Sequence, residues 1–325
     1  MHSIILTTLI LSLTTPTLSQ TWQILSSLPG PLQEHITLPL SNTQFITIGG
    51  INSNGTTIPQ LLIYDIPSNT WSPGTPIPIP LNHPNAITHN NKIYLLGGLT
   101  GASQWPPSPN TFVYDPKNPS WQPLASIPLS HSPRGAAASA AYNDTIYIAG
   151  GILSVYGPTV DTVSAYHIPS NKWIELPPKA AKLPGARDHT GYAQIENKFY
   201  VLGGRQDGAE NRKGDVFILD LQNVDQGWRT TNSKMPTPRG GIAAGVLGKT
   251  IYTFGGEGNV ESPMSGVFDE VESYDTENDL WEKLPRMRVG RHGMSAVGIG
   301  GKVYVPGGAV RQGFGSVNDL DVFEP

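Results

Sequence analysis

The 325-residue sequence contains no cysteine, which excludes disulfide bonds, thiol catalysis, zinc–thiolate sites and iron–sulfur clusters. Charged residues make up only 14% of the chain, the net charge is −4 and no basic face stands out, which argues against nucleic-acid binding. Beyond the N-terminus no apolar run approaches the ~18 residues of a membrane span, and no apolar stripe keeps helical spacing. We therefore expect little helix and no transmembrane segment.

Glycine and proline, by contrast, are abundant, with 36 and 30 residues. They separate short runs that are rich in β-branched and aromatic residues. Turn-forming residues at this density predict an all-β chain of many short strands.

The N-terminus has the pattern of a secretory signal. Its apolar run at residues 4–13 is too short to cross a bilayer, and small residues stand at positions −3 and −1 before Gln20. We therefore expect residues 1–19 to be a signal peptide and residues 20–325 to be one mature, secreted domain.

Glycine pairs recur along the chain at intervals of 48, 53, 53, 52 and 52 residues. They stand at 49–50, 97–98, 150–151, 203–204, 255–256 and 307–308. A tyrosine precedes five of the pairs by three residues. After each of the first five pairs comes a doublet, Tyr-Asp in three of the units, and then a tryptophan: Trp71, Trp121, Trp173, Trp228 and Trp281. A period near 50 residues with this composition is typical of propeller blades, in which tryptophan can fill the wedge between neighbours.

The motifs Tyr-x-x-Gly-Gly, Tyr-Asp and Trp, in six linked copies, resemble the Kelch-repeat family within the galactose-oxidase-like propellers. The resemblance covers roughly residues 21–325. It implies a six-bladed Kelch β-propeller with four antiparallel strands per blade. For the second blade it predicts strands at Ala86–Asn90, Lys92–Leu96, Thr111–Tyr114 and Trp121–Ile127.

The two ends of the chain predict how the ring closes. The C-terminal residues 322–325 match residues 113–116, so the last blade lacks its tryptophan strand. Trp22, near the start, has no glycine pair ahead of it. We therefore expect the N-terminal strand to close the last blade, which removes exposed sheet edges and suits a monomer.

Three positions per blade should lie at one mouth of the central channel, because the innermost strand begins beside the end of the second strand. The resemblance implies that partners dock there. Sixteen residues before each glycine pair stand Gln33, Leu81, Arg134, Arg187, Arg239 and Arg291. Two residues further on stand His35, His83, Ala136, His189, Gly241 and Gly293. Directly after the pairs stand Ile51, Leu99, Ile152, Arg205, Glu257 and Ala309.

Polar residues at the mouth are concentrated in blades four to six. The candidate ligand-binding residues are Arg187, Asp188, His189, Arg205, Arg239, Glu257, Glu270, Arg291 and His292, with His35 and His83 opposite them. Trp105 and Phe314, in loops at the mouth, are either stacking platforms for a sugar or part of the loop packing. The excess of arginine predicts an acidic ligand such as a carboxylate, sulfate or uronate.

Two interpretations of the repeated arginines stay open. A residue that recurs once per blade also suits a structural bridge between blades. Arg205 and Glu257, however, break the repeat, which favours a functional role for them.

No cofactor and no metal ion are expected, since the ring should keep His35, His83 and His189 apart. The copper radical of the galactose-oxidase relatives needs a cysteine cross-linked to tyrosine, and this chain has none. A secreted sialic-acid mutarotase family also uses six Kelch blades. An isomerase or lyase in which Glu257 acts with an arginine clamp that includes Arg205 is therefore the alternative.

The leading hypothesis is a secreted, non-catalytic binding module whose channel mouth holds an acidic carbohydrate or an extracellular protein. The signal sequence argues against an intracellular adaptor role. Sequons at Asn54 and Asn143 predict glycosylation in a eukaryotic host.

Overall fold

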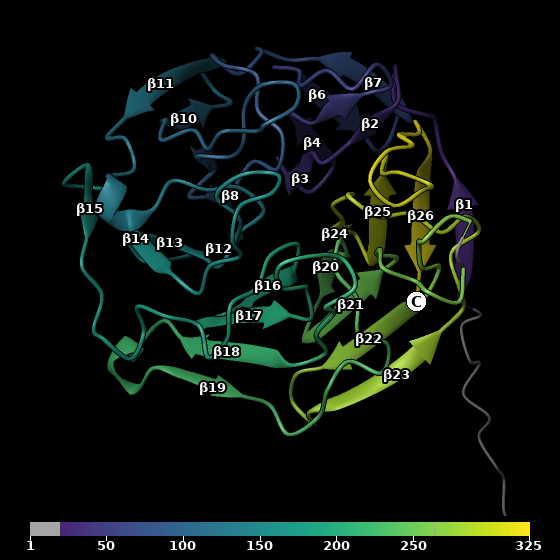
Figure 1. The fold of residues 1–325 in the computed structure, drawn as a ribbon. Coiled ribbons are helices and arrows are strands. Elements are labelled where there is room, and N and C mark those ends of the chain that lie inside the picture. Colours follow the sequence, from purple (N-terminus) through teal and green to yellow (C-terminus); the bar gives the residue numbers. More distant parts are fainter. Residues whose placement is uncertain (1–19, 263) are drawn as a thin grey trace, which may run out of the picture.

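Six four-stranded antiparallel sheets stand as blades around a central channel in the computed structural model, which describes residues 20–262 and 264–325 (Figure 1). The all-β, six-bladed prediction is confirmed. Residues 1–19, the predicted signal peptide, lie outside the described residues. Within the described ranges, no helix is long and apolar enough to cross a bilayer.

Each blade runs from an inner strand at the channel to an outer strand at the rim. Blade one is β3 (Ile36–Pro39), β4 (Gln44–Ile48), β6 (Leu61–Asp65) and β7 (Thr70–Pro73). Blade two is β8 (Ala86–His89), β9 (Lys92–Leu96), β10 (Thr111–Asp115) and β11 (Ser120–Leu124). Blade three is β12 (Ala138–Tyr142), β13 (Thr145–Ala149), β14 (Val163–His167) and β15 (Lys172–Ile174).

The second half of the ring repeats this order. Blade four is β16 (Gly191–Ile195), β17 (Lys198–Leu202), β18 (Val216–Asp220) and β19 (Trp228–Thr230). Blade five is β20 (Ala243–Leu247), β21 (Thr250–Phe254), β22 (Val271–Asp275) and β23 (Leu280–Leu284). Blade six is β24 (Val297–Ile299), β25 (Lys302–Pro306), β26 (Leu320–Glu324) and β1 (Thr21–Ile24). A short pair, β2 (Leu32–Gln33) with β5 (Ile51–Asn52), and two 3-10 turns, η1 (Leu129–His131) and η2 (Val224–Gln226), complete the elements.

The N-terminal strand closes the ring, as predicted. β1 pairs antiparallel with β26 along its whole length (Figure 1). Trp22 stands opposite Phe323, with ring centroids 5.0 Å apart, and its Nε1 donates to the Pro285 carbonyl of blade five at 3.3 Å. The first strand of the chain therefore occupies the place that a tryptophan strand occupies in the other blades.

The outer-strand tryptophans join neighbouring blades. Trp121 stacks on Tyr114 of its own blade, with ring centroids 5.1 Å apart. Its Nε1 donates to the Thr75 carbonyl of the preceding blade at 3.0 Å. The same kind of bond runs from Trp71 to Ser26, from Trp173 to Ala125 and from Trp228 to Ala180. These four tryptophans thus combine apolar packing with a hydrogen bond across a blade junction, whereas Trp281 of blade five packs on Tyr274 and its Nε1 has no partner among the described residues.

We expect Trp121→Ala to lower the free energy of unfolding by about 3 kcal/mol, because it leaves a cavity at a blade junction and removes the bond to Thr75. Trp105→Ala, which alters a loop outside the repeat, should lower it less. Urea unfolding of the two variants would measure the difference. Equal losses would contradict the structural role assigned to the outer-strand tryptophans.

The glycine pairs are required by the close approach of the next blade. A Cβ atom on Gly255, whose φ is +57°, would lie 2.1 Å from the Arg291 carbonyl oxygen. The amide of its partner Gly256 donates to that same carbonyl at 2.8 Å. Because every glycine pair makes this contact with the following blade, the pair links adjacent blades as well as ending a strand.

Candidate functional site

Six residues, one per blade, close one mouth of the channel with a ring of backbone hydrogen bonds. These residues, called here the axial ring, are Glu34, His83, Ala136, His189, Gly241 and Gly293. Each amide donates to the carbonyl of the equivalent residue in the preceding blade at 2.6–3.3 Å, and Glu34 bonds to Gly293 to complete the circle. All six have φ between 47° and 66°. This left-handed conformation turns each amide toward its neighbour.

The axial ring corrects the predicted alignment of the first blade. In five blades the second glycine of a pair donates to Leu81 or to one of the repeated arginines of the next blade. Around the closure, Gly308 donates to Leu32 at 2.8 Å. Leu32 and Glu34 are therefore the equivalents of Leu81 and His83, and the predicted equivalents were one residue too late.

His35, which was predicted to occupy this ring position, is the residue that follows Glu34 in the chain. It is buried, and neither ring nitrogen has a hydrogen-bond partner among the described residues. Burial lowers the pKa of His35 to about 4, so the imidazole is neutral near pH 7. It does not belong to the polar network at the mouth.

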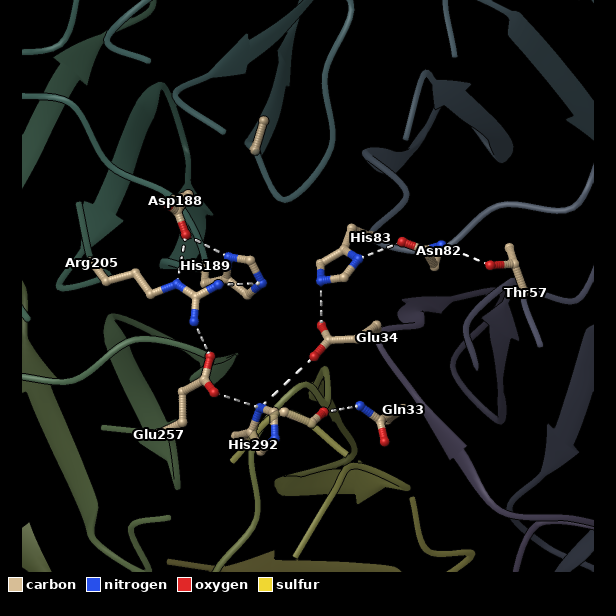
Figure 2. A network of polar contacts seen from close by, with 12 residues as sticks. Gln33, Glu34, Thr57, Asn82, His83, Asp188, His189, Arg205, Glu257 and His292 are labelled. Atoms are coloured by element: carbon tan, nitrogen blue, oxygen red, sulfur yellow. Dashed lines mark hydrogen bonds and ion pairs between the residues drawn. The ribbon is translucent and has the colours of Figure 1, made fainter. Parts of the chain in front are cut away.

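That network, called here the mouth cluster, contains Glu34, His83, Asp188, His189, Arg205, Glu257 and His292 (Figure 2). Arg205 and Glu257 directly follow glycine pairs. Single antiparallel backbone bridges pair Arg205 with Asp188 and Glu257 with Gly240. Since Asp188 and Gly240 each precede a ring residue, these bridges carry both side chains to the axis.

On one side of the mouth cluster, the Asp188 carboxylate accepts hydrogen bonds from a histidine and an arginine. Its Oδ1 accepts hydrogen bonds from His189 Nδ1 at 2.6 Å and from Arg205 Nε at 2.8 Å. Thr159 donates to Oδ2, and Arg205 Nη1 donates to Glu257 Oε1. The guanidinium is thus shared between two carboxylates.

On the other side, Glu34 Oε2 lies 3.0 Å from His83 Nε2. His83 Nδ1 lies 2.6 Å from the side-chain oxygen of Asn82. His292 Nδ1 connects the two halves, 3.5 Å from Glu257 Oε2 and 3.8 Å from Glu34 Oε1 (Figure 2).

The mouth cluster contains three carboxyl groups, one guanidinium and three histidines, so its net charge is negative when the histidines are neutral. Its three carboxyl groups belong to Glu34, Asp188 and Glu257. Burial alone would raise their pKa values, but neighbouring histidines, and Arg205 for two of them, hold each pKa below its usual range. Burial also lowers the pKa of His189. Three carboxylates therefore face one guanidinium.

The repeated arginines do not reach the mouth. Arg239 and Arg291 have no exposed area. Arg239 donates to the Gly255 carbonyl at 2.6 Å and to Glu272 at 2.5 Å, and Arg291 donates to Asp321 at 2.7 Å. These contacts favour the structural interpretation, so we leave both arginines out of the candidate site.

Two further residues that were predicted to bind a ligand instead form ion pairs within the protein. Arg187 is 5% exposed, donates to Asp215 at 3.1 Å and lies over the ring of Phe217 at 5.0 Å. Glu270 forms an ion pair with Arg286 at 3.1 Å. Both residues therefore have ionic partners within the protein.

A cavity of about 320 Å³ occupies the channel next to the axial ring. Residues of the inner strands β3, β8, β12, β16, β20 and β24 form its wall, and Glu34, His83 and His189 line its end. Ala136, Gly241 and Gly293 contribute little or no side chain to that end. A small molecule in the cavity would therefore touch the mouth cluster.

Loop residues around the same mouth are exposed and apolar or aromatic. Tyr156, Met264 and Phe314 are 87%, 96% and 48% exposed. Trp105 packs beside His83, with ring centroids 5.1 Å apart, and its buried Nε1 has no partner in the described part of the chain. The sequon residues Asn54 and Asn143 are exposed on other turns.

Sequence reasoning placed five members of the mouth cluster in blades four to six and His83 opposite them, and the structure brings all six together. It missed Glu34 and the supporting Asn82. A signal was available: Pro31-Leu32-Gln33 resembles Pro80-Leu81-Asn82, and aligning the two would have matched Glu34 with His83. The expectation that the ring separates His83 from His189 is wrong, since their ring centroids are 4.8 Å apart.

Similar proteins include a Kelch-like protein, a scruin and an epimerase. The chain is 33% identical over 306 residues to Kelch-like protein terF of Aspergillus terreus (91% of this chain, 65% of that protein). It is 29% identical over 211 residues to β-scruin of Limulus polyphemus (62% and 21%). It is 32% identical over 136 residues to the N-acetylneuraminate epimerase of Vibrio cholerae (41% and 32%). The chain spans less than two thirds of the length of each of these relatives.

A family profile described as the Attractin/LZTR1 β-propeller matches residues 45–317, which is most of the chain. The structure shows six four-stranded blades with the Kelch glycine pairs at the ends of the second strands. The chain therefore belongs to the Attractin/LZTR1 family of Kelch-repeat β-propellers.

Proposed function

We propose that this chain is a secreted, monomeric protein that binds a small polar ligand at the mouth cluster. One observation carries the proposal. Glu34, His83, Ala136 and His189 keep a left-handed backbone, which costs of order 1–3 kcal/mol per residue, at ring positions where Gly241 and Gly293 avoid that cost. At three of these four positions the side chain is polar and reaches the cavity, so a role for Glu34, His83 and His189 accounts for the strain retained there.

The charge of the mouth cluster favours a ligand with hydroxyl or amino groups. Three ionised carboxylates accept hydrogen bonds, whereas the one arginine of the cluster, Arg205, already serves Asp188 and Glu257. An acidic sugar, the class expected from the arginine count, would meet net repulsion here. A neutral or amino sugar would find acceptors in the carboxylates.

The exposed loop residues support contact with a larger partner at the same mouth. Tyr156, Met264 and Phe314 project around the polar centre. Exposed aromatic and methionine side chains beside a polar pocket suit a glycan or an extracellular protein. Such a partner would place one polar group in the cavity and rest on the loops.

Thermal-shift and calorimetric titrations with neutral sugars, amino sugars and uronates, at fixed ionic strength, test the ligand class. We expect neutral or amino sugars to stabilise the protein, and Glu257→Gln to abolish the effect. Glu175→Gln, which alters an exposed carboxylate outside the site, should leave binding unchanged. Stabilisation by uronates alone would overturn the charge argument.

Secretion is part of the proposal and has its own test. Expression of the full chain in a eukaryotic secretory host should release a protein that begins at Gln20. Asn54→Gln and Asn143→Gln should each remove one glycan, seen as a change of mass. Retention of residues 1–19 on a cytosolic protein would contradict this part.

A second candidate function is acid–base isomerisation of the bound ligand. The similarity to an epimerase over 136 residues favours it, together with His189, whose Nδ1 is held by Asp188 in the manner of a catalytic acid–base group. Glu257, the predicted base, is paired with Arg205 and has a lowered pKa, which makes it a weak base. Faster anomeric equilibration of a bound sugar, or incorporation of deuterium from D2O at one of its carbons, would establish turnover if it is lost in His189→Gln. The absence of both for every bound sugar would exclude this second function.

A further inference from the structure

We propose that Glu34, His83 and His189 bind one divalent transition-metal ion on the propeller axis. Each side chain offers one ligand atom, and these atoms all lie within 4.8 Å of one another. Modest side-chain rotation brings such a set to the distances of about 2.0–2.2 Å at which zinc binds imidazole and carboxylate. The proposal does not depend on the sugar ligand.

Both histidines are already oriented as metal ligands are. His83 Nδ1 lies 2.6 Å from Asn82 Oδ1, and the Asn82 amide nitrogen donates to Thr57 at 2.7 Å, so the oxygen must face the histidine. His189 Nδ1 lies 2.6 Å from Asp188 Oδ1. In each case the oxygen accepts a hydrogen bond from Nδ1, so that Nε2 faces the shared centre. There His83 Nε2 lies 3.0 Å from Glu34 Oε2 and His189 Nε2 lies 3.3 Å from Arg205 Nη2, and a metal ion would replace both contacts. Metal-binding histidines are typically held by such outer partners.

The local charge favours a cation at this point. Glu34 supplies one negative charge to the centre, and Glu257 and Asp188 lie in contact with the same network. Arg205 offsets only one of these charges. A divalent ion would therefore neutralise an otherwise negative, buried group of side chains.

The ligand set also indicates which metals fit. Two imidazoles and one carboxylate suit zinc, iron(II), cobalt(II) or nickel(II) better than calcium or magnesium, which prefer oxygen ligands. Three protein ligands leave positions open, and the cavity of about 320 Å³ reaches all three residues. A small molecule in the channel could bind the ion directly.

A metal ion here would occupy the Nε2 atoms of both histidines. It would therefore exclude the use of His189 as a proton carrier, whereas ligand binding at the mouth would gain a further contact. Metal binding measured in the absence of any sugar distinguishes the metal site from the proposed sugar binding.

The test is titration of the full-length, chelator-treated protein with Zn²⁺ and, as a spectroscopic probe, Co²⁺. We expect one equivalent to bind, with visible cobalt absorption that excess Zn²⁺ removes. Asp188→Asn and Asn82→Ala, which alter outer partners, should weaken binding about 10- to 100-fold. Glu34→Gln, His83→Gln and His189→Gln should weaken it further. His131→Gln, a histidine that faces Glu175 outside the site, is the matched control and should bind normally.

Circular dichroism would confirm that each variant is folded, and the wild-type stoichiometry and cobalt spectrum remain informative if a variant fails to fold. Two results would overturn the proposal: wild-type protein that takes up no Zn²⁺ or Co²⁺, and uptake that is the same in folded Glu34→Gln and His189→Gln as in the wild type.

Discussion

A chain that lacks residues 20–29 should lose its stable ring and aggregate. The deletion removes β1, which pairs with β26 over four residues, and takes away Trp22 from its contacts with Phe323 and Phe254. The edge of β26 would then be free to pair with another chain. Size-exclusion chromatography and thermal unfolding followed by circular dichroism would measure the loss.

Two controls separate closure from a general effect of truncation. A chain that begins at Gln20 keeps β1 and should behave as the mature protein. On the same strand, Trp22→Ala should lower the melting temperature strongly, whereas Gln23→Ala, at an exposed position, should barely change it. A soluble monomeric deletion variant with an unchanged melting temperature would show that the ring does not need β1.

Arg239→Met should lower the free energy of unfolding by about 3–5 kcal/mol. The substitution leaves Glu272 as a buried charge with no cationic partner, since both side chains of this pair are fully buried. It also removes bonds to the carbonyls of Gly255 and Thr237. Urea unfolding is the appropriate measurement. Arg286→Met, which alters a side chain that is 65% exposed, should lower the unfolding free energy less.

A double substitution tests the cause of that loss. In blade two the equivalent positions hold Leu81 and Phe112, which lie in one hydrophobic cluster. Arg239→Leu with Glu272→Phe copies that apolar pair and should recover part of the stability lost by Arg239→Met. A double variant less stable than Arg239→Met would show that the backbone bonds of Arg239, rather than the buried charge, dominate.

These pairs also show what the repeat could predict about the arginines. In blades one and two, Leu32 and Leu81 occupy the arginine position, and the second residue of the third strand is Leu62 or Phe112. Blades five and six place arginine there, with Glu272 or Asp321 in the third strand. The change from apolar to charged pairs is visible in the sequence once the blades are aligned, and it points to an internal ion pair rather than a ligand clamp.

The position of Glu34 shows the limit of counting along the chain. Blade one has one more residue between its ring position and its glycine pair than the other blades, so a fixed offset of sixteen selects Gln33 and His35. The hydrogen bond from Gly308 to Leu32 identifies the true equivalents. That bond joins residues 276 positions apart, and no local pattern reports it.

The sequence by itself determined the number of blades, their strand order and the closure by Trp22. These features depend on a local pattern of glycine pairs, aromatic residues and turns that each blade repeats, and adjacent blades contact one another through the same positions. Only the tertiary structure decided which polar residues meet on the axis. Glu34, His83 and His189 come from three different blades, and their meeting depends on the ring closing with each blade in register. The mouth cluster sets three carboxylates against one arginine because burial within the blades removes the repeated arginines, Arg187, Arg239 and Arg291, from the mouth.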